Sequence, residues 1–284
     1  MKISLSILVS LILGWNLLVI YIDNELDKNK QVDIYAQCNK VWVSRGEYTD
    51  FAKRNTIESM QKAFASGAIG VEFDFHYDTK MNRFIIAHNY PKKNANGELV
   101  YEKKNNGKIL TIEEFLQAFK DENKYYWFDF KNLDKLSAAN SNKAINRLLS
   151  ITDENLRKHF YIEGSNPLKL SLYADAGFQT LLGMRPLKDS NIFAPLAADA
   201  FKIVYYFFNI SALAMAYGDE ENPYYGEKTE KSFKNIPIFL FHLPHKRELL
   251  KKLVVKKNVK VILPESLPNS LIKENVININ ICKE

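Results

Sequence analysis

The chain has 284 residues, 46% of them hydrophobic and 25% charged, which is the composition of a globular protein with a full-sized core. Two cysteines are too few for a disulfide-rich scaffold or a four-thiolate zinc site. The net charge of +6 permits anionic partners, but the lysines are interspersed with acidic residues and no nucleic-acid-binding module is recognisable. We therefore expect no nucleic acid among its partners.

The N-terminal segment is the first predicted element. Residues 3–22 carry no charge, and several acidic residues follow them. About 20 apolar helical residues cross the hydrocarbon core of a bilayer, and no small-residue cleavage site lies near the end of this run. We expect residues 1–22 to be a signal anchor that tethers the rest of the chain to the extracytoplasmic side of the membrane. A long, cleaved signal peptide is the alternative, and it would also export the chain.

A polar segment follows this apolar run. Residues 23–36 are rich in charged side chains, and we expect them to be a linker to one folded domain at residues 37–284. Cys38 and Cys282 would be able to pair in an oxidising compartment if the two ends of this domain meet, and the sequence leaves that open.

From residue 37 onward, short apolar runs alternate with longer segments whose apolar residues recur at helical spacing. The expected strands are 40–43, 69–77, 83–87, 125–130, 160–163, 180–184, 236–241 and 259–263. The expected helices are 55–66, a segment that begins at Thr111, 168–176 and about 245–255. Such alternation, without a glycine-rich dinucleotide-binding loop, favours an α/β fold of the TIM (β/α)8-barrel type over a doubly wound sheet.

Two segments give more detailed expectations. Thr111 followed by Glu114 is a capping box, so a helix should begin there. Residues 203–215 carry no charge, and we expect them to pass from a buried helix into a strand. A loop that faces a membrane is the alternative for this segment.

The strand at residues 71–76 alternates polar and apolar residues. Glu72, Asp74 and His76 should face one side, while Phe73 and Phe75 pack behind them. Two carboxylates on one face repel each other unless a cation lies between them. On an antiparallel sheet the same pattern would only mark a solvated face.

Other predicted strands also end in polar residues. The side chains that should meet these carboxylates at the carboxyl ends of barrel strands are Ser44, Arg45, His88, Asp129 and Lys131. Glu72, Asp74 and Asp129 together are suited to a hard divalent cation, Mg²⁺ or Ca²⁺. Arg45 and Lys131 supply the positive charge that a phosphodiester needs, and a histidine can transfer protons near neutral pH.

The motifs occur in a characteristic order along the chain. They are Ser44-Arg45-Gly46, Asn55-Thr56, Gly67-Ala68-x-Gly70-x-Glu72-x-Asp74, Ala87-His88-Asn89 and Asp129-Phe130-Lys131. This order resembles the glycerophosphodiester phosphodiesterase family of the phospholipase C-like phosphodiesterases. The typical pattern of that family is His-Arg-Gly, Glu-Asn-Thr, Gly-Ala-Asp-x-x-Glu-x-Asp, His-Asp and Glu-x-Lys on a TIM barrel. The resemblance covers roughly residues 40–268.

Carried over by position, the resemblance implies a role for each site residue. Glu72, Asp74 and Asp129 would hold the divalent cation. Arg45 would bind the phosphate, with Ser44 able to hydrogen-bond it. Lys131 would stabilise developing charge as well as bind substrate, and His88 would donate or accept the proton. The implied substrate is a glycerophosphodiester or another phosphodiester derived from a phospholipid.

Three positions depart from the family pattern. Ser44 stands where the family has its first histidine, Arg54 replaces the glutamate before Asn-Thr, and Asn89 replaces the aspartate after the second histidine. A serine does not shuttle protons near neutral pH, and losing one of two acid–base groups costs about 10²- to 10⁴-fold in rate. His76 is a candidate to replace the missing histidine, with a histidine buried inside the barrel as the alternative.

Three functional hypotheses follow, of which the last is a barrel that serves as a structural part of an assembly or of the cell envelope. The first is a metal-dependent phosphodiester hydrolase that acts on glycerophosphodiesters or related lipid headgroups. The second is a catalytically impaired protein of the same fold that binds a phosphate or a lipid, because the first family histidine is Ser44.

Overall fold

The structure is a computed structural model that describes residues 5–28, 34–37, 39–120, 123–244 and 246–264. Within these residues, eight parallel strands pair in the order β1, β2, β7, β8, β9, β10, β11, β12. Their bounds are β1 (Val43–Ser44), β2 (Gly70–Asp78), β7 (Tyr125–Phe130), β8 (Phe160–Gly164), β9 (Gln179–Met184), β10 (Ala212–Ala216), β11 (Ile238–Leu243) and β12 (Val259–Pro264).

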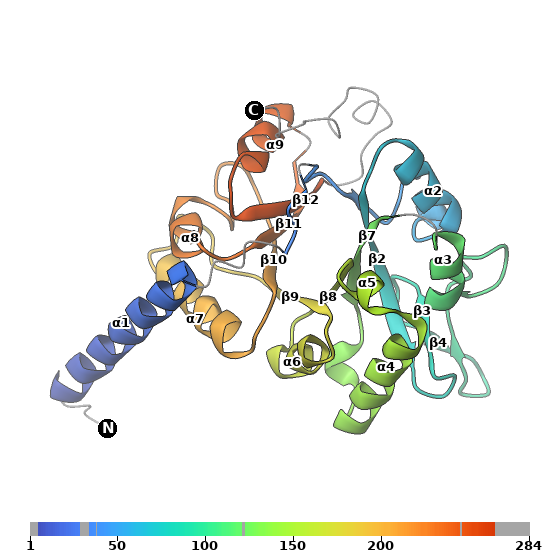
Figure 1. Cartoon of the computed structure of the whole chain (residues 1–284), viewed down its shortest axis with the longest axis horizontal. Coiled ribbons are helices and arrows are strands. Elements are labelled where there is room, and N and C mark those ends of the chain that lie inside the picture. The colour runs from blue at the N-terminus through green and yellow to red at the C-terminus, as the bar shows by residue number, and fades with distance from the viewer. Residues whose placement is uncertain (1–4, 29–33, 38, 121–122, 245, 265–284) are drawn as a thin grey trace.

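Main-chain hydrogen bonds close the sheet into a ring. The Trp42 N–H donates to the carbonyl of Ile262 at 3.0 Å, and the Ile262 N–H donates to the carbonyl of Lys40 at 2.8 Å. These bonds join the segment that leads into β1 to β12, so the first and last strands of the sheet become neighbours (Figure 1). The prediction of a TIM-type barrel is confirmed.

Helices surround the ring of strands (Figure 1). They are α2 (Ile57–Ala65), α3 (Ile112–Ala118), α4 (Ala138–Ile151), α5 (Glu154–Arg157), α6 (Pro167–Asp175), α7 (Ala194–Phe207), α8 (Glu227–Ser232) and α9 (Arg247–Val254), with single 3₁₀ turns at Phe51–Lys53 and Leu133–Lys135. Between β2 and α3 the chain forms β3 (Arg83–Ile86), β4 (Lys92–Lys93), β5 (Leu99–Val100) and β6 (Leu110–Thr111). β3 pairs antiparallel with β2, and β4 pairs with β5 in a separate hairpin.

The pleat of the strands separates two hydrophobic cores. Phe73 on β2 faces outward, and its ring centroid lies 4.6 Å from that of Phe115 on α3. The inside of the barrel is filled by aromatic residues, among them Trp42, Tyr161 and Phe239. Since side chains alternate along a strand, the polar residues between the outward phenylalanines of β2 point into the barrel.

The local sequence signals agree with the elements that form. The predicted strands and helices appear with bounds shifted by a few residues. The side chain of Thr111 caps α3, and Glu114 completes the capping box as expected. Residues 203–215 cover the end of α7 and most of β10, which is the expected passage from helix to strand, but the end of α7 is only partly buried and Phe207 is exposed.

The N-terminal apolar segment forms helix α1 (Leu5–Lys28). Of the helices in the described ranges, it is the one long and apolar enough to cross a membrane, and almost none of that stretch is buried. The structure departs from the expected linker at residues 23–36, because α1 continues to Lys28 and its last turns pack on the barrel, where Ile22 and Leu26 are buried. The chain therefore leaves the helix later than its polarity suggested. Cys38 and Cys282 lie outside the described residues.

Candidate active site

A cavity of about 650 Å³ lies at the carboxyl ends of the barrel strands. Its walls come from β1, β2, β7, β8, β9, β11 and β12 and from the loops that follow several of them. The side chains of interest that line it are Ser44, Arg45, Glu72, His88, Tyr90, Trp127, Asp129, Lys131, Glu163, Met184, Arg185, Phe241 and His242. In a (β/α)8 barrel this is the end at which active sites form.

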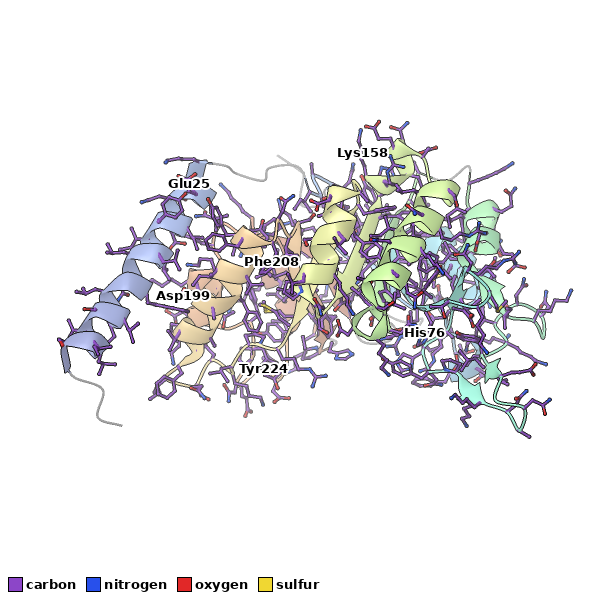
Figure 2. The ribbon with its side chains drawn as sticks, turned by 90° about the horizontal axis from the view of Figure 1, so that it is seen from below. Glu25, His76, Lys158, Asp199, Phe208 and Tyr224 are labelled. Atoms are coloured by element: carbon purple, nitrogen blue, oxygen red, sulfur yellow. The ribbon has the colours of Figure 1, made fainter. Side chains whose placement is uncertain are left out.

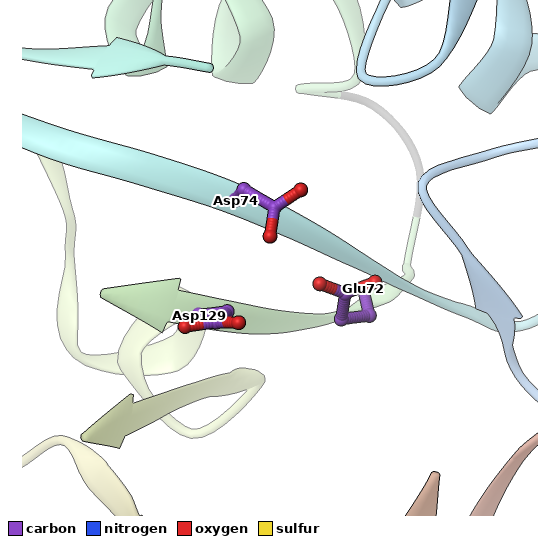
Figure 3. Close-up of side chains that lie close together, drawn as sticks. All are labelled: Glu72, Asp74 and Asp129. Carbon is purple, nitrogen blue, oxygen red and sulfur yellow. The ribbon is translucent and has the colours of Figure 1, made fainter. Parts of the chain in front are cut away.

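Three carboxylates converge at this cavity. Glu72 and Asp74 lie on β2, and Asp129 lies beside them on β7, where it is in register with Asp74. Each offers an oxygen within 4.8 Å of the others, and Figure 3 shows the three side chains turned toward a common space. The expected meeting of these acidic residues is thus present in the fold.

The turn after β1 places Arg45 against this cluster. Arg45 has a left-handed backbone with φ of 57°, which is uncommon for a residue with a side chain. Two main-chain hydrogen bonds hold it: its N–H donates to Glu72 at 2.7 Å, and its carbonyl accepts from Asn55 at 3.0 Å. Gly46 follows, and a Cβ there would lie 2.6 Å from the main chain of Ser59. The glycine is required because the turn packs directly on helix α2.

Asp74 is fully buried, and it has more ion-pair and hydrogen-bond partners than the other two carboxylates. Its Oδ2 lies 3.0 Å from Arg45 Nε and accepts a hydrogen bond from Asn55 Nδ2 at 2.8 Å. Its Oδ1 lies 2.7 Å from Lys131 Nζ. Burial alone would raise the pKa of the Asp74 carboxyl, but Lys131 and Arg45 outweigh it and hold the pKa below its usual value. Asp74 is therefore ionised at neutral pH.

The negative charges of Glu72 and Asp129 are balanced by fewer cationic and hydrogen-bonding partners than that of Asp74. Ser44 Oγ donates to Glu72 at 2.6 Å. Burial, together with the charge of Asp74, raises the pKa of Glu72 to about 8. Burial also raises the pKa of Asp129, although its ion pair with Lys131 opposes the shift. A divalent cation with oxygen ligands would relieve this repulsion, so the three side chains fit such an ion.

His88 lines the cavity two residues after the end of β3. Two of the residues that depart from the family pattern, Asn89 and Arg54, lie next to its ring. Asn89 Oδ1 lies 3.1 Å from His88 Nδ1, and Arg54 Nη2 approaches the same nitrogen at 3.4 Å. The two neighbours make opposite demands on Nδ1, because the Asn89 oxygen accepts a proton from it whereas Arg54 donates one to it, so the tautomer of His88 depends on which contact is made. The departures from the family pattern therefore concentrate around Glu72 and His88.

His76 does not take part in lining the cavity. It is buried, and its ring packs against Tyr90 at 5.1 Å and Tyr101 at 6.2 Å between centroids. Burial lowers the pKa of His76 to about 4, so the imidazole is neutral at pH 7. It shares the β2 face with Glu72 and Asp74 as expected, but the cavity wall is formed by Tyr90, against which His76 packs, and not by His76 itself.

Several titratable residues that line the cavity were not among the predicted site residues, and Glu163 and His242 are two of them. Glu163 on β8 is in register with Asp129 and accepts a hydrogen bond from Trp127 Nε1 at 2.7 Å. Burial and the charge of Asp129 raise its pKa well above the usual value. His242 on β11 reaches the cavity from a left-handed backbone with φ of 51°. The criterion that selected His88, a polar residue at the end of a predicted strand, would have found both, because Glu163 ends the predicted strand 160–163 and His242 directly follows 236–241.

Comparison with known proteins shows where this fold occurs. No protein-family model matches the sequence, and neither does any curated protein. A solved glycerophosphodiester phosphodiesterase from Parabacteroides distasonis is 15% identical, with a TM-score of 0.57 over 85% of this chain and 99% of the other. A second from the same organism is 10% identical, with a TM-score of 0.56 over 91% and 94%.

A third similar structure holds a ligand. It is an Oleispira antarctica phosphodiesterase in complex with the product sn-glycerol-3-phosphate, 13% identical to this chain, with a TM-score of 0.57 over 86% of this chain and 99% of the other. The identities are low, but the alignments span nearly the whole of each solved chain. The chain therefore has the fold of the glycerophosphodiester phosphodiesterases.

Proposed function

We propose that the protein is a metal-dependent hydrolase of phosphodiesters derived from phospholipids. In this reaction water attacks phosphorus, one P–O ester bond breaks, and the products are a phosphate monoester and an alcohol. The observation that carries the proposal is the convergence of two carboxylates, two cationic side chains and a histidine on the wall of one cavity at the carboxyl ends of the barrel strands, with the third carboxylate, Asp74, buried beside them.

Each group has a chemical part in this reaction. Arg45 and Lys131 are fixed by Asp74 and line the cavity, so they are placed to bind the phosphate and to offset the charge that develops on its oxygens. His88 is positioned to take a proton from water or to give one to the leaving alcohol. Glu72, Asp74 and Asp129 would hold Mg²⁺ or Ca²⁺, and such an ion polarises a phosphoryl oxygen and lowers the pKa of bound water.

One observation favours a second candidate function, a protein that binds phosphodiesters without turnover. Ser44 occupies the position of the family's first histidine, and its hydroxyl is engaged by Glu72. The cation and phosphate groups would then remain while one acid–base group is missing. This candidate keeps the same ligands and differs only in the chemical step.

The test uses the full chain, purified in detergent, with Mg²⁺ or Ca²⁺ and with glycerophosphocholine or lysophosphatidylcholine as substrate. We expect hydrolysis, and we expect Glu72→Gln to lower it by about 10²-fold or more and to weaken binding of the cation in calorimetry. Glu154→Gln is the matched control, because the Glu154 side chain is 78% exposed on α5. Hydrolysis that survives Glu72→Gln unchanged would contradict the proposed site.

Ser44→His separates the two candidates. If the chain only binds its ligand, the new imidazole is expected to create hydrolysis where there was none. If the chain is already an enzyme, wild-type activity is measurable beforehand. Ser44→Ala is the control, because it removes the hydrogen bond to Glu72 without adding an acid–base group.

We further propose that α1 anchors the domain in a membrane, with the cavity on the extracytoplasmic side. The length and hydropathy of α1 support the anchor. Extraction of membranes with alkaline carbonate should leave the protein in the membrane pellet, and protease added to the extracytoplasmic side should digest the barrel. Release of the chain by carbonate would contradict the anchor.

A further inference from the structure

An apolar surface begins at the mouth of the cavity. Met184 and Arg185 line the cavity at the end of β9, and the loop that follows them leads into α7. Large apolar side chains in this loop and on α7 are exposed to solvent: Leu187 (38%), Ile192 (78%), Phe193 (59%), Leu196 (50%) and Phe207 (60%). We call these five residues the α7 surface. Exposed apolar residues that gather in one region mark a contact with another molecule or with a membrane.

Helix α7 carries no uncompensated charge that would oppose such a contact. Its charged residues are Asp199 and Lys202, whose side chains lie 3.2 Å apart. Lys202 is also paired with Asp23 of α1 at 2.8 Å and is only 3% exposed. Because both charges are engaged between the two helices, the outward side of α7 is left to apolar residues.

Helix α1 is fixed beside α7 in a defined direction. Asp27, in its last turn, accepts a hydrogen bond from Asn235 at 2.7 Å, and Asn235 precedes β11 at the amino end of the barrel. His76, near the end of β2, and Tyr224, after β10, mark the end of the barrel at which the cavity opens. Figure 2 shows that α1 lies away from this end at Glu25, and that its N-terminal part lies at about the same height as these two residues. The exposed apolar turns of α1, with Leu11 63% and Leu17 66% exposed, therefore extend on the same side as the cavity mouth.

We propose that the α7 surface contacts the bilayer that holds α1, so that the cavity opens at the membrane and takes a phosphodiester carried by a bilayer lipid. The proposal rests on the proposed hydrolase and on α1 as its anchor, and it narrows the substrate class to lipids. A bilayer is the occupant that the structure favours, because α1 docks on α7, and α1 is itself long and apolar enough to cross a membrane.

The first experiment places a polarity-sensitive fluorophore on the surface. Phe193→Cys is labelled in the full chain with Cys38 and Cys282 replaced by serine, and the protein is reconstituted into phosphatidylcholine–phosphatidylglycerol vesicles. We expect a blue shift and quenching by lipids with brominated acyl chains. Val255→Cys is the matched control, since Val255 is 65% exposed but ends α9 at the opposite end of the barrel. Equal behaviour at both positions would overturn the proposal. A shift that follows protein density and not the lipid quencher would assign the surface to a second copy and overturn it as well.

The second experiment measures function. The double variant Ile192→Asp, Phe193→Asp is expected to lower hydrolysis of lysophosphatidylcholine in vesicles on the order of tenfold, while hydrolysis of soluble glycerophosphocholine stays unchanged. Val255→Asp should alter neither. Equal loss on both substrates, or loss on neither, would overturn the inference. If the wild type hydrolyses neither substrate, the proposed enzyme fails, and the fluorophore still decides whether the surface meets lipid.

Discussion

Asp74 offsets the positive charges of Arg45 and Lys131, because side chains from three different segments of the chain contact its carboxylate. Arg45 comes from the turn after β1, Asn55 from the turn before α2, and Lys131 directly follows β7. A buried carboxylate is stable only when such partners replace its lost hydration. The same contacts orient the arginine and the lysine, so one residue both stabilises the site and positions the groups that would bind phosphate.

His76 gives a prediction at the residue scale. Its pKa is about 4 in the folded chain and 6.5 in an ordinary environment, so the unfolded chain binds the additional proton between these values. Stability from the neutral imidazole is therefore complete above pH 6.5 and is lost as the pH falls toward 4. Between pH 7 and pH 5 it contributes a loss of about 2 kcal/mol in the free energy of unfolding. Urea denaturation of His76→Gln should show a correspondingly smaller loss, and identical losses in both proteins would refute the assignment.

Glu163 gives a second prediction, which Gly183 makes testable. A Cβ on Gly183 would lie 2.7 Å from Glu163 Oε1, so Gly183→Ala should displace this carboxyl group from the cavity wall. We expect the variant to fold and to bind the divalent cation as the wild type does, because Glu72, Asp74 and Asp129 are untouched. Its KM for the phosphodiester should change, since the shape and polarity of the substrate cavity change. Unaltered KM and kcat would show that Glu163 is outside the substrate's reach.

Helix α3 illustrates how a single element supports the site. It begins directly after β6, and its Phe115 packs on Phe73, the residue between the two carboxylates of β2. The capping box at its start satisfies main-chain N–H groups that would otherwise be left without a partner. By stabilising the start of α3, the capping box helps to hold Phe115 in place against the outer face of β2.

The prediction for this element concerns its cap. Thr111 is 2% exposed, and its Oγ1 accepts from the Glu114 N–H at 3.3 Å. Thr111→Ala should lower the free energy of unfolding by about 1–2 kcal/mol, as losses of helix caps do. Thr111→Ser keeps the hydroxyl and should lose less. Chemical denaturation of the two variants gives the comparison, and equal losses would mean that the methyl group, not the cap, is important.

At the scale of the whole molecule, the closure of the barrel brings the site together. Arg45 and Lys131 are far apart in sequence, and both reach Asp74 only because β1 and β7 flank β2. The interior is filled by large aromatic side chains, so the ring closes around Trp42, which packs directly over Gly70. Any change that moves this indole affects the strands that carry the site.

Gly70→Ala tests this dependence. A Cβ on Gly70 would lie 2.2 Å from Trp42 Cδ2, well inside contact distance. We expect a loss of about 1–3 kcal/mol in stability, as for other overpacked cores, with a change in tryptophan fluorescence. Gly14→Ala is the matched glycine control, since nothing lies within 4 Å of its would-be Cβ. A melting temperature unchanged by Gly70→Ala would contradict tight packing in the barrel.

The predictions from sequence succeeded where the signal was local and periodic. Alternation on β2 placed Glu72 and Asp74 on one face, and the chain order of strands and helices indicated a barrel. They were less informative where a contact joins distant segments. His76 obeys the alternation and yet lies behind Tyr90, and Glu163 and His242 reach the cavity by way of strands whose sequences carry no motif.

The sequence by itself determined the secondary elements, the inward face of β2 and the kinds of side chain available for a phosphodiester site, because these depend on short-range periodicity and residue chemistry. The tertiary structure alone decided which charges meet, which histidine lines the cavity, and how α1 lies against α7. Such contacts depend on the register of strands and on packing between segments far apart in sequence, such as Asp27 and Asn235, which are 208 residues apart, and no local pattern encodes them.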